Sequence, residues 1–131
     1  MSARATKSRR CGRPEAVARL AKAKRYLHWA AAALEEEDYD VAAGNAVIAA
    51  IAAADTICCI RLGTRSVDDD HQAASALVAR ADPNAGKALV RVLGVKHRAH
   101  YDHVPVPASA AKAAVRGARS LVEVAEAAMQ A

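Results

Sequence analysis

The alternation of apolar and polar residues along the chain follows an α-helical period. After Pro14, which suits a first helical turn, apolar side chains recur every three or four residues as far as Leu34. The same spacing predicts a second helix from about Asp40 to a terminating Gly63. A last helix is expected from about Ala108, where small and apolar residues again share one stripe.

A third helix is expected to begin after the glycine turn and to run through Ala81. Either Ser66 or Asp68 can cap it, because a side-chain oxygen at that point accepts hydrogen bonds from free backbone amides. The aspartates at its start also suit the positive end of the helix dipole.

A fourth helix is expected to begin at Asp82 and Pro83, a capping residue followed by a proline in the first turn. It is expected to continue into the segment KHRAHYDH, residues 96–103, after which Pro105 and Pro107 break the chain. The whole pattern therefore predicts an all-α fold, an up-and-down bundle of four long helices and one shorter helix.

The composition limits the size and nature of the core. A chain of 131 residues suits one domain, and 53% of it is hydrophobic, most of this alanine, with only 3% aromatic. The core is therefore expected to be thin and close-packed. The stretch from Val41 to Ile60 is apolar enough for a membrane span, but Asn45 and Asp55 would make insertion costly. We expect a buried central helix and no membrane partner.

The three cysteines, Cys11, Cys58 and Cys59, offer neither a paired disulfide framework nor a complete zinc site. They are interpreted as small buried hydrophobic residues in a reducing compartment. The N-terminus lacks the apolar run of a secretion signal, so a cytoplasmic location is expected.

The net charge of +5 comes from the first thirteen residues. They carry no acidic residue, whereas basic and acidic residues balance from Pro14 onward. A flexible basic arm of residues 1–13, ahead of a helical domain of residues 14–131, can hold polyanions by releasing counterions. The alternative is a solubilising tail without a binding role. The basic residues of the arm are Arg4, Lys7, Arg9, Arg10 and Arg13.

The segment KHRAHYDH concentrates candidate catalytic residues. Metal-independent cleavage of RNA needs a base for the 2′-hydroxyl proton and a cation for the phosphate, tasks that suit histidine and arginine. Arg98 and His103 have four residues between them. In an unbroken helix they would point about 140° apart, so they meet only if the helix ends near Tyr101. The alternative is that both are surface residues at a helix end.

Two other pairs have a similar arginine-to-histidine spacing, namely Arg65 with His71 and Arg91 with His97. The spacing alone is therefore a weak signal. Arg65 and His71 are nevertheless candidates for lining the same cleft as the KHRAHYDH segment.

Three histidines at intervals of three, His97, His100 and His103, form a ladder that could hold zinc or nickel if the last helical turn loosened. We favour no metal and no cofactor, with His100 as a supporting residue. Tyr101 is interpreted as a packing residue, or as a hydroxyl donor to a phosphate.

Asp55 lies on the buried seam of the second predicted helix. A buried carboxylate needs a partner, and Arg98 or a histidine is the expected one. A structural ion pair is the first interpretation, and a role in orienting a catalytic group is the second.

Several segments together resemble the HEPN domain (higher eukaryotes and prokaryotes nucleotide-binding). They are DYDVAAGNAVIAAIAAADTICC, RLGTRSVDDDH, LGVKHRAHYDH and VPASAAKAAV, and the likeness covers about residues 15–130. More narrowly, the chain is similar to a bacterial branch with a CCxRLGxRS segment and an AHY triplet.

The resemblance implies a helical bundle that forms a homodimer. Active HEPN members are metal-independent endoribonucleases of toxin and defence systems, with an arginine, four to six residues and a histidine in a cleft between two subunits. Arg98 and His103 match this signature, whereas Ala99 replaces the polar residue that usually follows the arginine. The alternative implied function is an inactive module that binds RNA, a nucleotide or a protein partner, such as a nucleotidyltransferase-like antitoxin.

Overall fold

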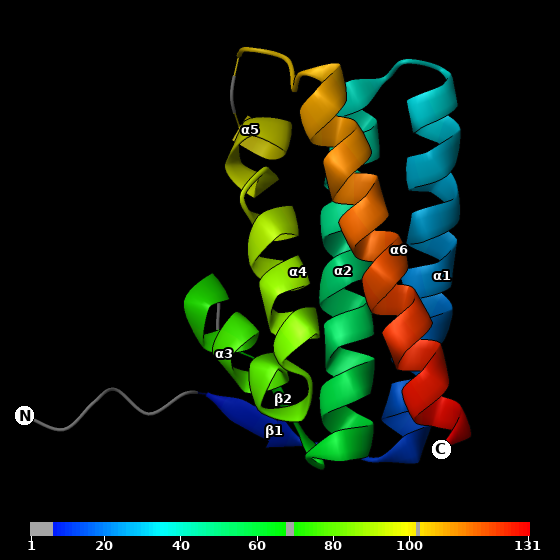
Figure 1. The fold of residues 1–131 in the computed structure, drawn as a ribbon, viewed down its shortest axis with the longest axis vertical. Coiled ribbons are helices and arrows are strands. Elements are labelled where there is room, and N and C mark those ends of the chain that lie inside the picture. The colour runs from blue at the N-terminus through cyan, green and yellow to red at the C-terminus, as the bar shows by residue number, and fades with distance from the viewer. Residues whose placement is uncertain (1–6, 68–69, 102) are drawn as a thin grey trace, which may run out of the picture.

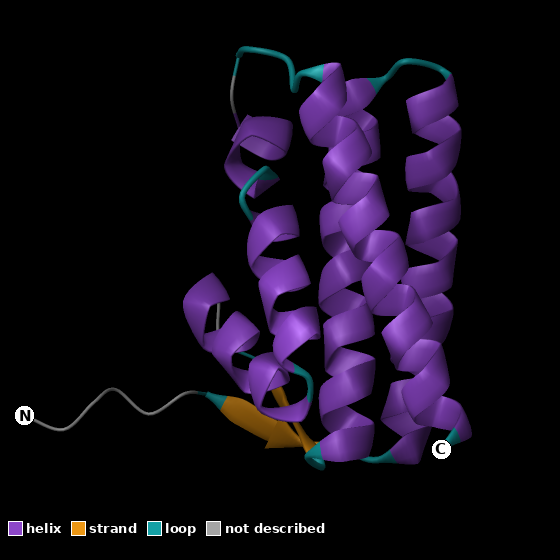
Figure 2. Ribbon diagram, in the orientation of Figure 1, coloured by secondary structure: helices purple, strands orange, loops and turns teal. Residues whose placement is uncertain are grey.

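A computed structural model describes residues 7–67, 70–101 and 103–131 of the chain, and its fold is an all-α bundle with a small two-stranded sheet (Figures 1 and 2). The predicted fold class is therefore confirmed. In chain order the elements are β1 (Ser8–Arg10), α1 (Arg13–Glu35), α2 (Tyr39–Arg61), β2 (Thr64–Ser66), α3 (His71–Ala81), α4 (Pro83–Leu93), α5 (Lys96–Tyr101) and α6 (Ala108–Gln130).

Helix α2 is the centre of the bundle. It packs against α1 and α6 on one side and against α3, α4 and α5 on the other (Figure 1). It is long and apolar enough to cross a membrane, but 78% of its apolar window is buried inside the protein, which confirms the prediction of a buried central helix. The alanines along α2 let neighbouring backbones approach closely, and larger residues such as Ile57, Leu89 and Leu121 fill the remaining space.

The helix boundaries agree with the sequence pattern at most positions. Gly63, at φ 71°, follows the end of α2 in the left-handed conformation that favours glycine. Asp82 caps α4 as predicted, because its carboxylate accepts from the amide of Ala85 at 3.0 Å. The predicted cap of α3 is wrong: Asp70 accepts from the amide of Gln72 at 2.9 Å, whereas Ser66 lies in β2. Asp68 lies outside the described residues.

The fourth predicted helix is in fact two helices. Helix α4 ends at Leu93, and Gly94, a poor helix former, follows it with its amide bonded to the carbonyl of Val90 at 3.1 Å. The chain then begins again as the six-residue helix α5, which packs against α2. The break separates the polar KHRAHY segment from α4 and lays it beside the first half of α2.

Part of the segment predicted as a flexible basic arm, residues 1–13, is folded. Residues Ser8–Arg10 form β1, which pairs antiparallel with β2, and α1 already begins at Arg13. The next residue after the strand, Cys11, is disulfide-bonded to Cys59 near the end of α2. This corrects the interpretation of these two cysteines as unpaired hydrophobic residues. The sequence does not reveal this pairing, because it predicts Cys11 in a flexible arm with no fixed partner.

The disulfide also bears on the expected compartment. Such bonds are typical of oxidising environments and rare in a reducing cytoplasm. The cytoplasmic location therefore stays a prediction, and it no longer has the support of three free cysteines. Cys58 alone fits the original interpretation, as a free and buried thiol.

Gly86 makes the close packing of α3 against α4 possible, which yields a test of the fold. A Cβ at this position would lie 2.6 Å from the Cβ and 3.0 Å from the Cα of Ala79. We therefore expect Gly86→Ala to lower the free energy of unfolding by about 1–2 kcal/mol, because the backbone of α3 must move. Gly12→Ala is the control, since its Cβ would meet only a side-chain oxygen at 3.9 Å. Equal urea midpoints for Gly86→Ala and the wild type would contradict this packing.

Candidate functional site

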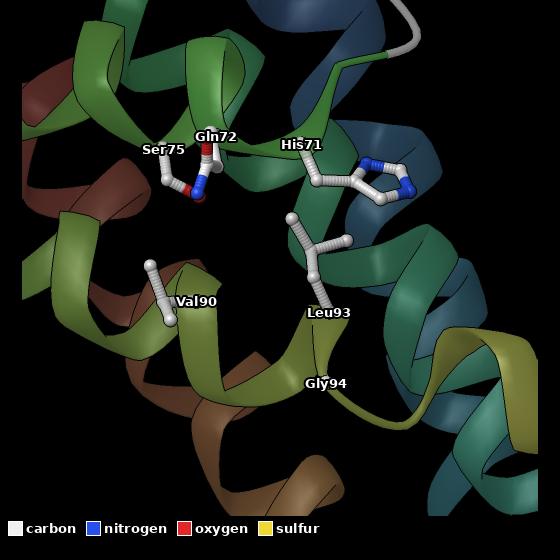
Figure 3. Close-up of a pocket in the computed structure, with 6 residues that line it drawn as sticks. All are labelled: His71, Gln72, Ser75, Val90, Leu93 and Gly94. Atoms are coloured by element: carbon white, nitrogen blue, oxygen red, sulfur yellow. The ribbon is translucent and has the colours of Figure 1, made fainter.

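A cleft opens where the start of α3, the end of α4 and the helix α5 come together. Its volume is about 290 Å³, and its lining combines an apolar floor with titratable side chains from α3 and α5. The lining residues are His71, Leu93, Gly94, Lys96, His97 and Tyr101. An adjoining cavity of about 220 Å³ extends from His71 between α3 and α4, where Gln72 and Ser75 face Val90 and Leu93 (Figure 3).

The side chains of Lys96 and His71 meet in this cleft. The Nζ of Lys96 lies 3.0 Å from the Nε2 of His71. An ammonium group can only donate, so Nε2 accepts and the proton of the neutral imidazole is on Nδ1. The contact therefore joins a cation to a neutral imidazole, with the cation on α5 and the imidazole at the start of α3.

The aromatic rings of α5 form a second group beside this pair. The ring centroids of His97 and Tyr101 are 5.4 Å apart, and those of His100 and Tyr101 are 6.1 Å apart. Tyr101 is 69% exposed, so it lies outside the core, and its ring contacts the imidazoles of the same helix. Its hydroxyl is open to a ligand.

Gly44 of α2 explains how α5 is seated. A Cβ at residue 44 would lie only 3.2 Å from the Cε1 of His100. The missing side chain therefore makes room for the imidazole against the backbone of α2. His100 thus has a positioning contact, and it does not line the cleft.

The predicted catalytic pair is not assembled within one chain. Arg98 and His103 are both exposed, and neither lines the cleft. Within the described ranges, no hydrogen bond or ion pair joins the two side chains. The break at Gly94 turns α5 so that its Lys96, His97 and Tyr101 line the cleft in place of Arg98. The catalytic roles of Arg98 and His103 stay predictions.

The expected partner of Asp55 is wrong. Its carboxylate lies 3.6 Å from the guanidinium of Arg19 on α1, and no described histidine or Arg98 reaches it. The reason is distance along α2, since residues 44 and 55 are about 16 Å apart on a helix and α5 packs near the first of them. Asp55 therefore belongs to the opposite end of the bundle from the cleft.

Burial changes the acidity of Asp55. The loss of hydration raises the pKa of its carboxyl to about 6, although Arg19, Arg65 and Lys22 act in the opposite direction. The proximity of Arg65 to this carboxyl, in β2, corrects the idea that Arg65 lines the same cleft as the KHRAHYDH segment. Of that predicted pair only His71 reaches the cleft, because it begins the helix that packs beside α5.

A metal site at the histidine ladder finds no support in the described residues. No group of three histidine, cysteine or acidic side chains within residues 7–67, 70–101 and 103–131 is close enough to hold an ion. His97 faces the cleft while His100 packs over Gly44, so these two imidazoles do not converge. Asp102, which stood beside the ladder in the sequence, lies outside the described residues.

Sequence reasoning did not single out Lys96 as a site residue. The sequence places it only within the fourth predicted helix, and its contact with His71, 25 residues earlier, depends on how α3 and α5 pack. The only signal available was its place at the head of the KHRAHYDH segment. Asp40 was missed in the same way: its carboxylate accepts from the amide of Val106 at 2.7 Å and fixes the proline segment after α5 to the start of α2.

No protein-family model fits this chain, and no curated protein is significantly similar to it. The resemblance to HEPN domains therefore rests on the sequence segments that carry it.

Proposed function

We propose that this chain is a HEPN-type protein that binds RNA through the sugar-phosphate backbone at the cleft between α3 and α5. The contact between Lys96 and His71 carries the proposal, because it sets a cation and a neutral imidazole side by side in an open cleft. The six lining residues include no acidic side chain. Such a lining suits an anion, and phosphate is the anion that RNA repeats along its length.

The aromatic content argues for backbone contacts over base contacts. Proteins that read single-stranded bases stack them on several aromatic side chains. Here the cleft offers only Tyr101 and the imidazoles of His71 and His97. A phosphate held by Lys96, with the Tyr101 hydroxyl as a further donor, is the binding mode that these residues support best.

The protein used in the test is the full chain in EDTA, with single-stranded oligouridylate as the probe. We expect Lys96→Ala to weaken binding about tenfold and to lower the salt slope of log K by about 1, because one phosphate contact is lost. Lys112→Ala, an exposed lysine on α6, is the matched control and should bind as the wild type does. Equal affinity of Lys96→Ala and the wild type, with helix content unchanged by circular dichroism, would refute this site.

RNA cleavage is the second candidate function, and the neutral His71 beside Lys96 favours it. In metal-independent cleavage a base takes the 2′-hydroxyl proton, the 2′-oxygen attacks phosphorus, and the 5′-oxygen leaves with a proton from an acid. His71 can act as the base once the Lys96 ammonium leaves Nε2 for the phosphate, because Nε2 carries the only lone pair of the neutral ring. Lys96 then stabilises the phosphate charge. By resemblance, a homodimer would bring Arg98 and His103 of two subunits into the same reaction.

Cleavage and binding are separated by incubating the protein with structured RNA in EDTA. The wild type is compared with His71→Ala, Arg98→Ala and His103→Ala. A nuclease of the HEPN type loses activity in the last two variants, whereas a site built on His71 loses it in the first. A wild-type protein that binds but never cuts leaves a binding module, with a nucleotide or an antitoxin-like protein as further ligands to test.

A further inference from the structure

The far end of the bundle from the cleft carries an unexplained basic surface. Three cations, Lys7, Arg9 and Arg10, are exposed on and beside β1, and Arg61 is exposed at the end of α2. Within the described part of the chain, none of these four side chains forms an ion pair. The predicted arm residue Arg13 is different, because its guanidinium donates to the carbonyl of Met129 at 2.9 Å. Arg4 lies outside the described residues.

The register of the ribbon formed by β1 and β2 places two like charges opposite each other. Arg9 pairs directly with Arg65, so their side chains leave the ribbon on the same face. Like charges directly across an antiparallel pair are destabilising. Arg65 lies within the electrostatic reach of Glu15 and Asp55, whereas Arg9 forms no ion pair with any residue that the structure describes. An anion bound between the strands would relieve this repulsion.

The ribbon of β1 and β2 is too short to be stable by itself. Only three residues of each strand pair, and one backbone bond extends the ribbon at each end, from Cys11 to Gly63 at 3.0 Å and from Val67 to Lys7 at 3.1 Å. Two-stranded ribbons of this kind are marginally stable in water. The disulfide of Cys11 with Cys59 fixes β1 to the end of α2, directly after the strand ends.

We propose that the ribbon of β1 and β2 is a second phosphate-binding surface for RNA, held in place by the disulfide of Cys11 with Cys59, and that reduction of this disulfide weakens binding. The surface shares its ligand class with the proposed function but needs none of the residues of the cleft. Its cations are on different elements at the other end of the bundle (Figure 1).

The redox step needs an external dithiol. One thiolate of the dithiol attacks a sulfur of the disulfide, the second displaces the mixed disulfide, and the products are two protein thiols and an oxidised reductant. The neighbouring thiol of Cys58 does not divert this exchange, because burial, with the charge of Asp55, raises its pKa to about 12 and keeps it protonated. Reduction therefore breaks the bond between Cys11 and Cys59 without forming a new bond to Cys58.

The test measures oligouridylate affinity of the full chain over a range of salt concentrations, before and after treatment with dithiothreitol. We expect the reduced protein to bind about fivefold more weakly with a shallower salt slope, because Arg9 and Lys7 are no longer held beside Arg65 of β2. Cys11→Ser should show the same weaker binding and no response to the reductant. Circular dichroism confirms that the helices persist at the temperature used.

A second variant separates the effect of charge from the effect of losing the disulfide. Lys7→Gln with Arg9→Gln removes the two cations that alternate to the face of β1 shared with Arg65, keeps the disulfide and should also weaken binding about fivefold. Arg116→Gln with Arg119→Gln, an exposed pair on α6, should not weaken it. Affinity that is equal in both redox states, or unchanged in the β1 variant, overturns the proposal even if Lys96→Ala shows that the cleft binds RNA. Binding of the β1 surface to anionic phospholipid vesicles but not to RNA also overturns it.

Discussion

Replacing Cys11 with serine is expected to lower the free energy of unfolding by about 4 kcal/mol, the largest stability change among the substitutions considered. The disulfide joins residues 48 apart in sequence. Closing a loop of that length lowers the entropy of the unfolded chain, which raises the free energy of unfolding by about 4 kcal/mol at 25 °C. A small domain with a thin alanine core has a total stability of only about 5–15 kcal/mol, so this loss is a large share of it. Urea denaturation of the oxidised wild type and the variant measures the difference.

The reduced wild type provides the internal comparison for this experiment. It should unfold at the same urea concentration as Cys11→Ser, because both lack the same bond. Cys58→Ala removes the neighbouring thiol and leaves the disulfide intact, so it should respond to reductant as the wild type does. A wild type whose unfolding midpoint is the same with and without dithiothreitol would show that the bond does not contribute to stability.

The fold could be predicted from local sequence signals to a large extent. The three long helices begin or end within a few residues of Pro14, Gly63 and Ala108, since periodicity, capping and glycine chemistry act over one or two turns. Two failures are local, namely the cap of α3 and the break at Gly94, and the others concern contacts between segments distant in sequence. The sequence predicts Cys11 in a flexible arm, because no local signal reports the partner strand β2, which lies more than fifty residues later.

The sequence predicts the segment in which the candidate site lies, but not which of its side chains line the cleft. The richness of KHRAHYDH in histidine pointed to α5, and its Tyr101 does line the cleft with His71, as the sequence allowed. The break at Gly94 rotated the segment, so that Lys96 and His97 enter the cleft and Arg98 does not. The direction in which a six-residue helix faces depends on its packing against α2, and no periodicity in so short a stretch specifies it.

The ion-pair partner of Asp55 also could not be predicted from the sequence. The sequence identified a carboxylate on a buried seam that needed a partner, which is correct. It could not choose among thirteen arginines, because the choice depends on which neighbouring helix lies beside that turn of α2. The structure gives Arg19, from the helix that precedes α2 along the chain.

Burial makes Asp55 a cost to stability at neutral pH, and Asp55→Asn should remove that cost. The pKa of its carboxyl is raised from 3.8 to about 6, so between about pH 4 and pH 6 the folded protein binds a proton that the unfolded chain has lost. The free energy of unfolding therefore falls as the pH rises through this window, by up to about 3 kcal/mol for this group. We expect Asp55→Asn to be more stable than the wild type at pH 7 by about 1–3 kcal/mol, and nearly equal to it at pH 4.

Thermal or urea unfolding of both proteins from pH 4 to pH 8 measures this difference. Asp38→Asn is the matched control for replacing a carboxylate with an amide at an exposed position, because the Asp38 side chain makes no capping bond. A variant less stable than the wild type at pH 7 would mean that the ion pair with Arg19 outweighs the loss of hydration. A neutral asparagine keeps nearly the same shape as aspartate, so the comparison isolates the effect of the buried charge. The sign of the difference in the free energy of unfolding at pH 7 therefore decides whether the charge of Asp55 stabilises or destabilises this end of α2.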